Sequence, residues 1–135
     1  MSESKQHQQL VELIYKKVIE IVGQDHKTLI ATDAVDGLTL PPFTTEGFRP
    51  DVFYCYENLL VIGEAKISDD IEKFHSKQQY ESYIRKCSLF HGNAVLIVAV
   101  PWLDHAVIFN IITRIRKKYP GDYSVIILDG IGGAI

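Results

Sequence analysis

The sequence of 135 residues predicts an α/β fold in which helices flank a mixed β-sheet. Two observations predict it: amphipathic segments of helical length alternate with apolar runs of strand length, and the last two strands each follow a helix. The expected order is helix, three strands, helix, strand, helix, strand. A chain of this length can bury one hydrophobic core but not two, so we expect residues 1–135 to form a single domain.

The first part of the chain predicts a helix, a short strand and a long loop. Apolar residues recur three and four positions apart over residues 6–22, which is typical of an amphipathic helix, and Gly23 is a natural stop. The apolar, β-branched residues 28–32 predict a strand. Residues 33–49 include two prolines and two glycines and predict a loop. Loops of this length are uncommon in compact domains and are often functional.

The central part predicts two adjoining strands and a helix. Residues 51–56 and 59–67 form the strands, and the second is apolar on both faces, as in a strand at the centre of a sheet. The pattern Asp69-x-x-Glu72 is typical of a capping box and predicts a helix over about residues 70–87. Beyond it we expect a strand at 94–100, a helix over about residues 103–118 and a strand at 123–128.

Three charged residues of the adjoining strands are expected to meet. If Glu57-Asn58 is a two-residue turn, counting outward along the hairpin places Asp51 opposite Glu64 on the same face, with Cβ atoms about 5 Å apart. Lys66, two positions further along, lies on that face as well. The spacing therefore gathers two carboxylates and one amine at one point, and a slip of register would disperse them.

These groups suit a divalent cation beside a phosphate. Mg²⁺ prefers oxygen ligands and is usually held by one or two carboxylates together with substrate phosphate. Asp51 and Glu64 could supply the carboxylates, and the backbone carbonyl of Ala65 is a candidate third ligand. A bound metal lowers the pKa of a water, and Lys66 could orient that water, offset charge on the phosphate, or act as the general base. The spacing leaves these roles of Lys66 open.

A purely structural interpretation of the three residues is also open. Asp51 could cap the entrance to its strand, and Glu64 and Lys66 could form a local ion pair. Charged residues in an otherwise apolar central strand are costly, however, unless they are paired or functional. This cost favours the functional interpretation.

Pro50-Asp51 and Glu64-Ala65-Lys66, set in this order of elements, resemble the PD-(D/E)xK nuclease superfamily, which includes restriction endonucleases, Holliday-junction resolvases and RecB-like nucleases. The resemblance covers about residues 6–100 and implies a restriction endonuclease-like α-β-β-β-α-β core, with the last helix and strand as an extension. It also implies hydrolysis of DNA phosphodiester bonds with Mg²⁺, for which Mn²⁺ can substitute.

Further residues extend the resemblance. Gln79 and Tyr83 fit the Gln-x-x-x-Tyr motif of the RecB-like branch and share one face of the predicted helix. The resemblance implies that they help to place the substrate phosphate and Lys66, whereas the structural alternative is a solvated Gln79 and a core Tyr83. It also implies an acidic residue of the first helix near the metal, for which Glu12 is the better candidate and Glu20 the competitor.

The charge distribution is uneven along the chain. The net charge of −3 argues weakly against a nucleic-acid protein. Residues 28–69, however, carry 7 acidic and 2 basic residues, a net −5, and residues 70–119 carry 8 basic and 4 acidic residues, a net +4. A metal site beside a phosphate-binding surface would give such a pattern, and so would a solvated surface of uneven charge.

The expected function is therefore that of a metal-dependent DNA endonuclease of a restriction, repair or phage-defence type. One alternative is a structure-selective nuclease like the Holliday-junction resolvases, which are usually basic, and another is a domain of the same fold that binds nucleic acid or a partner without cutting. One site cuts one strand, so we expect a homodimer or a larger protein partner that supplies specificity.

The ends and the apolar runs of the chain predict its location. The polar residues 1–9, an N-terminal tail that includes His7, lack the apolar segment of a signal peptide, and no apolar run is long enough to span a membrane. We therefore expect a cytoplasmic protein that does not enter membranes. The histidines show no metal-ligand spacing.

Overall fold

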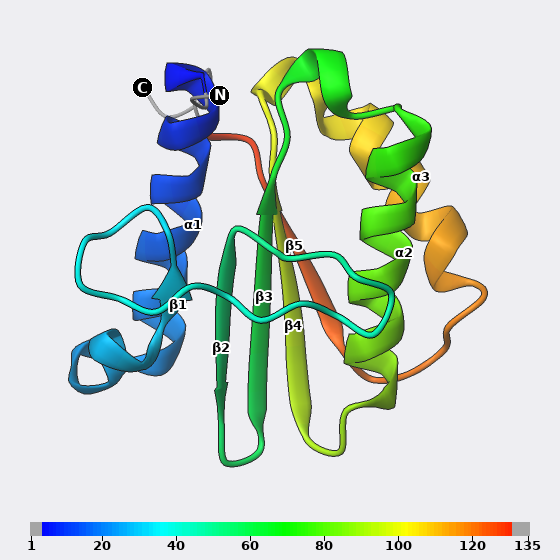
Figure 1. Ribbon diagram of the computed structural model, residues 1–135. Helices are drawn as coiled ribbons and strands as arrows, with labels where there is room; N and C mark the ends of the chain where they lie inside the picture. Colours follow the sequence, from blue (N-terminus) through cyan, green and yellow to red (C-terminus); the bar gives the residue numbers. More distant parts are fainter. Residues whose placement is uncertain (1–3, 131–135) are drawn as a thin grey trace.

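The computed structural model describes residues 4–130 and shows one five-stranded sheet with helices on both faces (Figure 1). The strands lie in the order β1-β2-β3-β4-β5. The strand β2 runs antiparallel to both β1 and β3, whereas β4 runs parallel to β3 and β5 parallel to β4. The predicted α/β class, with a mixed sheet flanked by helices, is confirmed.

The elements have the following bounds. The helices are α1 (Lys5–Val22), α2 (Phe74–Leu89) and α3 (His105–Arg116), and the short 3-10 helices are η1 (Gln24–Leu29), η2 (Ser68–Asp70) and η3 (Trp102–Asp104). The strands are β1 (Ala31–Thr32), β2 (Val52–Tyr56), β3 (Leu59–Ala65), β4 (Asn93–Ala99) and β5 (Ser124–Leu128). Within residues 4–130, no helix is long and apolar enough to cross a membrane.

The helix α1 covers one face of the sheet and packs closely on β3. Its residues Leu10, Ile14 and Val18 are fully buried in the core of this face. Gly63 of β3 permits the close approach, because a Cβ atom at this position would overlap Cγ2 of Ile14. The glycine thereby fixes the distance between α1 and the strand that carries the candidate site.

The helices α2 and α3 cover the opposite face of the sheet. Successive side chains of a strand point to opposite faces. In β3, Val61 and Ala65 accordingly belong to the core under α1, whereas Leu60 and Ile62 belong to the core under α2 and α3. By the same alternation, Glu64 points toward α2.

The predicted hairpin turn and its register are confirmed. Tyr56 pairs with Leu59, and the paired positions continue as far as Val52 and Gly63. Glu57 occupies the turn with a φ of 53°, a left-handed conformation that a tight hairpin turn requires. One step beyond the last pair, Asp51 and Glu64 are the next opposed positions.

Some predicted element boundaries are wrong. The first two residues of the segment 28–32 belong to η1, and β1 contains only Ala31 and Thr32, because the chain turns into the long loop after them. The helix expected from about residue 70 begins at Phe74, and the capping box does not form. The burial of Ile71, whose carbonyl accepts a hydrogen bond from Tyr80 at 3.0 Å, holds the chain out of a helix before that point.

The predicted loop, residues 33–49, crosses the sheet to α2 and returns to Asp51 (Figure 1). At its far end the Ser82 hydroxyl of α2 donates to Glu46 Oε1 at 2.6 Å and lies 2.7 Å from the Thr44 hydroxyl. Arg85 Nη1 lies 2.5 Å from the same Glu46 carboxylate. The Ser82 hydrogen bond and the Arg85 charge hold the pKa of Glu46 below its usual value. These contacts anchor the loop to α2.

Ser82→Ala is expected to lower the free energy of unfolding by about 1–2 kcal/mol. The change leaves the buried Thr44 hydroxyl without its side-chain partner and removes a charge-assisted hydrogen bond from Glu46. Chemical denaturation measures the loss. Ser88→Ala is the control, because the Ser88 hydroxyl bonds only to the Arg85 carbonyl in an exposed position. Equal losses in the two variants would show that Ser82 does not anchor the loop.

Candidate active site

Asp51, Glu64 and Lys66 converge at the end of β3. Lys66 Nζ lies 3.3 Å from Glu64 Oε2. The backbone N–H of Ala65 donates to Asp51 Oδ2 at 2.9 Å, and the N–H of Asp51 donates to the Gly63 carbonyl at 3.0 Å. The backbone of the hairpin therefore fixes Asp51 beside the strand that carries the other two residues, as the register predicts.

The three charged side chains are largely withdrawn from solvent. The exposed fraction of the side chain is 19% for Asp51, 5% for Glu64 and 12% for Lys66. Burial, and secondarily the negative charge of Asp51, raises the pKa of Glu64 to about 8, against the opposing effect of Lys66. Strongly perturbed carboxyl groups of this kind are typical of functional sites.

Two buried oxygen atoms at this point have no hydrogen-bond partner within residues 4–130: Oε1 of Glu64 and the hydroxyl of Tyr83. The Tyr83 hydroxyl is a neighbour of Glu64: it lowers the pKa of that carboxyl, and the carboxyl raises the pKa of the hydroxyl. Buried polar atoms without partners are rare and call for a partner such as an ion. A divalent cation would satisfy the Glu64 oxygen, so the residues present fit such an ion.

The set of protein groups that could bind the metal ion is nevertheless small. Among the described residues, no group of three or more His, Cys, Asp or Glu side chains is placed to hold a metal ion. Asp51 and Glu64 would therefore supply two carboxylates, with Ala65, which lies next to Glu64 at the end of β3, as the candidate carbonyl ligand. Mg²⁺ tolerates such a set, because it commonly keeps several waters and takes further oxygens from substrate phosphate.

Gln79 approaches the site from α2. Lys66 Nζ donates to Gln79 Oε1, so the lysine is held between this amide and the Glu64 carboxylate. Tyr83, one turn further along α2, is fully buried and lies beside Glu64. The structure thus brings both residues of the Gln-x-x-x-Tyr pattern to the site. Gln79 contacts Lys66, whereas the environment of Tyr83 is the core.

Gln79→Ala is expected to slow turnover by about 10- to 100-fold, while the affinity for Mn²⁺ changes little. The amide orients Lys66 rather than contacting the carboxylates, and removal of such a supporting partner typically has an effect of this size. Single-turnover cleavage and a calorimetric Mn²⁺ titration separate the two quantities. A large loss of Mn²⁺ affinity with an unchanged rate at saturating metal would contradict this role.

The first helix approaches the site through a residue that the sequence interpretation missed. Glu12 is exposed, and Glu20 is exposed and lies 3.4 Å from Lys17. Instead, His7 Nε2 lies 3.5 Å from Asp51 Oδ2. The residue was expected in a polar tail, but α1 begins at Lys5, with the Ser4 hydroxyl accepting the His7 N–H at 3.1 Å.

The sequence does contain a signal for His7. Serine is a favoured N-cap residue, and Ser4 therefore permits the helix to start earlier than its apolar residues indicate. His7 precedes the buried Val11 by four positions, so both lie on one face of the helix. The helix predicted over residues 6–22 already includes His7, so this spacing was the signal that could have directed it toward the sheet.

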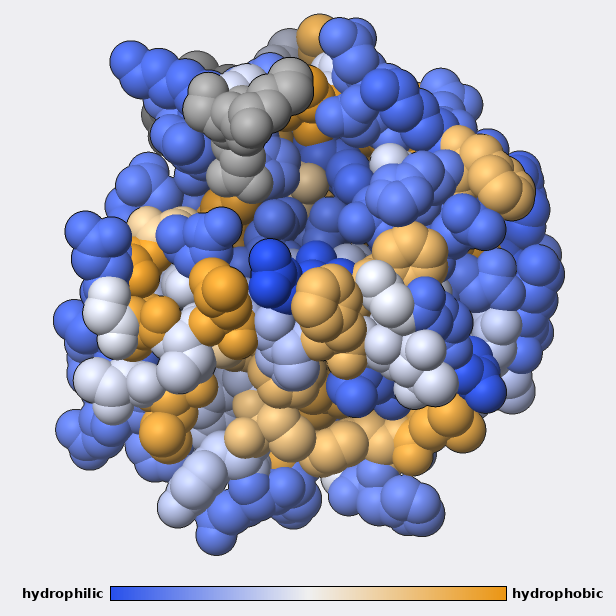
Figure 2. All heavy atoms as spheres, viewed as in Figure 1, coloured by the Kyte–Doolittle hydropathy of each residue, from blue (hydrophilic) through white to orange (hydrophobic). Residues whose placement is uncertain are grey.

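A hollow of about 190 Å³ opens beside Asp51, on the side of the loop. Its lining includes Thr32, Asp33, Arg49 and Asp51. The guanidinium carbon of Arg49 lies 5.0 Å from the centre of the Phe43 ring. Figure 2 shows apolar groups among polar ones on the face that this loop crosses. Arg49 thus places a cationic group in the hollow that Asp51 also lines, and Asp33 adds a negative charge to the same lining.

Comparison with known proteins finds no family model, no curated protein and no solved structure that matches this chain.

Proposed function

We propose that the protein is a metal-dependent nuclease that hydrolyses phosphodiester bonds of DNA. The observation that carries the proposal is the buried Glu64 carboxyl, which has an unpartnered oxygen and lies between Asp51 and the Lys66 ammonium. The mixed sheet and the order of the elements are compatible with a restriction endonuclease-like core. The resemblance of Pro50-Asp51 and Glu64-Ala65-Lys66 to PD-(D/E)xK nucleases supports the same function.

In this proposal Asp51, Glu64 and the Ala65 carbonyl hold Mg²⁺ or Mn²⁺. When bound, the ion supplies a Lewis acid for the phosphate and a water of lowered pKa. Asp51 is oriented for this role by the Ala65 N–H, and Glu64 by its place in β3. At neutral pH the Glu64 carboxyl holds a proton in the absence of metal, so this proton has to leave before the carboxylate can bind a cation.

Lys66 places positive charge next to the carboxylates. Its ammonium is held by Glu64 and Gln79, so little conformational freedom is lost when it donates to a phosphate oxygen or to the attacking water. The charge that develops on the phosphate during hydrolysis is thereby offset by a group already in position. Gln79 contributes by positioning Lys66.

The protein partners that we expect follow from the presence of one active site in each chain. One site cuts one strand, so a duplex break needs either two sites, from a second copy of the chain or a larger partner, or a step in which one site docks again on the other strand. Two-fold dimers are the commonest assembly of soluble proteins. We propose a homodimer, or a partner protein that also supplies sequence or structure specificity.

Incubation of the purified protein with supercoiled plasmid and with end-labelled single-stranded, duplex and branched oligonucleotides tests the function. The expected result is cleavage of at least one substrate with Mg²⁺ or Mn²⁺ and none with excess EDTA. Cleavage that persists in EDTA, or none with either metal on any of these substrates, would overturn the proposal.

A further inference from the structure

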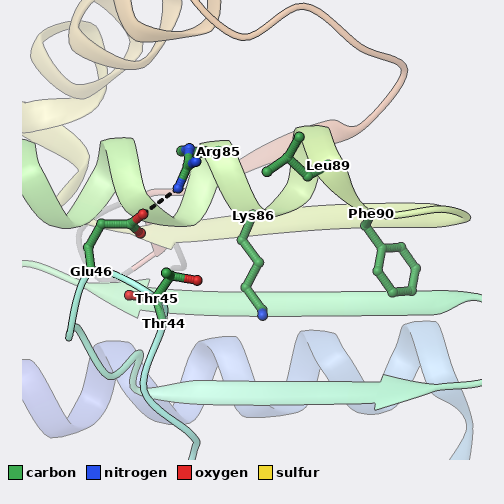
Figure 3. A pocket seen from close by; sticks show the side chains of 7 residues that line it. All are labelled: Thr44, Thr45, Glu46, Arg85, Lys86, Leu89 and Phe90. Carbon is green, nitrogen blue, oxygen red and sulfur yellow. Dashed lines mark hydrogen bonds and ion pairs between the residues drawn. The ribbon is translucent and has the colours of Figure 1, made fainter.

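A second hollow, of about 230 Å³, lies between the tip of the 33–49 loop and the C-terminal half of α2. Figure 3 shows its lining: Thr44, Thr45, Glu46, Arg85, Lys86, Leu89 and Phe90. The Lys86 side chain extends from α2 into the space between Thr45 and Phe90. The hollow thus has hydroxyl groups at one end, an aromatic ring at the other and an amine between them.

The charges in this hollow do not cancel. Glu46 is matched by Arg85, with 2.5 Å between the charged groups. Among the described residues, Lys86 then remains as a positive charge without a carboxylate partner. Within residues 4–130 the other partly buried lysines, Lys17 and Lys66, each lie within 3.4 Å of a glutamate. A cation without a counter-charge can take an anionic ligand without giving up an existing partner.

The position of Lys86 on α2 relates the hollow to the candidate active site. Lys86 follows Gln79 by seven positions, which is two helical turns, so both lie on nearly the same face of the helix. The rise between them along the axis is about 10.5 Å. In a duplex, phosphates of one strand recur about every 3.4 Å along the axis. The rise from Gln79 to Lys86 therefore corresponds to a few nucleotides of one strand.

We propose that this hollow binds a backbone phosphate of the nucleic-acid substrate, a few nucleotides from the bond that is cut, through Lys86. The inference rests on the proposed function and names the second point at which the same strand is held. Thr45, at the exposed tip of the loop, also lines the hollow and offers a hydroxyl to the strand. The Phe90 ring provides a surface for the adjoining sugar or base.

Salt-dependent binding tests this inference without cleavage. Fluorescence anisotropy in EDTA measures binding of a labelled single-stranded oligonucleotide to the wild type, Lys86→Met and Lys77→Met at several salt concentrations. Methionine removes the charge and keeps much of the length of the side chain. Lys77 is the matched control, because it is exposed on the same helix and does not line the hollow. Circular dichroism confirms that each variant is folded.

The expected result is that the slope of log K against log[salt] becomes less steep by about 0.7 in Lys86→Met, the value for one phosphate of a single strand. Lys77→Met should retain the wild-type slope. Equal slopes for Lys86→Met and the wild type, the same change in both variants, or no binding by the wild type would overturn the inference. Micromolar binding of inorganic phosphate that depends on Lys86, with unchanged DNA slopes, would identify a free anion as the ligand and also overturn it.

The outcomes separate this inference from the proposed function. Binding that depends on Lys86, together with no cleavage in Mg²⁺ or Mn²⁺, would leave the phosphate site standing and remove the nuclease. Metal-dependent cleavage with identical slopes for Lys86→Met and the wild type would do the reverse.

Discussion

Glu64→Gln is expected to reduce metal-dependent cleavage by at least about 10³-fold, equivalent to ~4 kcal/mol of transition-state stabilisation. Glutamine matches the size of glutamate and can occupy the same buried position, but it cannot supply the negative charge that a divalent cation requires. Single-turnover cleavage of an end-labelled oligonucleotide at saturating Mg²⁺ measures the effect. Glu72→Gln is the control, because Glu72 is exposed near the start of α2.

The control variant is expected to cleave at the wild-type rate. If Glu64→Gln is folded and cleaves within about tenfold of the wild type, the assignment of Glu64 as a metal ligand is wrong. A matching loss in both variants would point to a general effect of charge rather than to the site.

The second large effect concerns stability and pH in the absence of metal. The pKa of Glu64 is about 8 in the folded protein and has an ordinary value of 4.5 in the unfolded chain. Between these values the unfolded state ionises and the folded state retains its proton, so unfolding becomes easier as the pH rises. The contribution of Glu64 to the free energy of unfolding is fully present below pH 4.5 and is lost progressively up to about pH 8. Between pH 5 and pH 8 the free energy of unfolding falls by about 4 kcal/mol through this group.

Glu64→Gln removes this dependence, because glutamine does not titrate. Chemical denaturation of both proteins in EDTA, from pH 5 to 8.5, is expected to show that the variant gains stability over the wild type as the pH rises. A difference in unfolding free energy that stays constant with pH would show that the Glu64 carboxyl is not strongly perturbed.

The hairpin and the register of its charged residues could be predicted from the sequence, because both depend on local chemistry. The two residues Glu57-Asn58 determine which positions pair, and strand alternation then places Glu64 and Lys66 on one face. The apolar character of residues 59–67 likewise predicts a central strand, and β3 is paired on both sides. These features need no knowledge of distant contacts.

Other parts of the site depend on contacts between distant segments and could not be read in the same way. The anchoring of the loop by Ser82 joins positions whose pairing has no local pattern. The delayed start of α2 follows from the burial of Ile71, which the capping pattern does not reveal. His7 approaches Asp51 because α1 packs at a short distance from β3, which the missing side chain of Gly63 permits.

In the proposed site Asp51 and Glu64 jointly hold a divalent cation beside Lys66. Anomalous diffraction from a crystal grown with Mn²⁺ above pH 8, where Glu64 is ionised, tests it most directly. The expected result is one anomalous peak in contact with both carboxylates, and its loss in Glu64→Gln. A protein that cleaves DNA with Mn²⁺ but shows no peak at these residues, or a peak held only by other side chains, would contradict it.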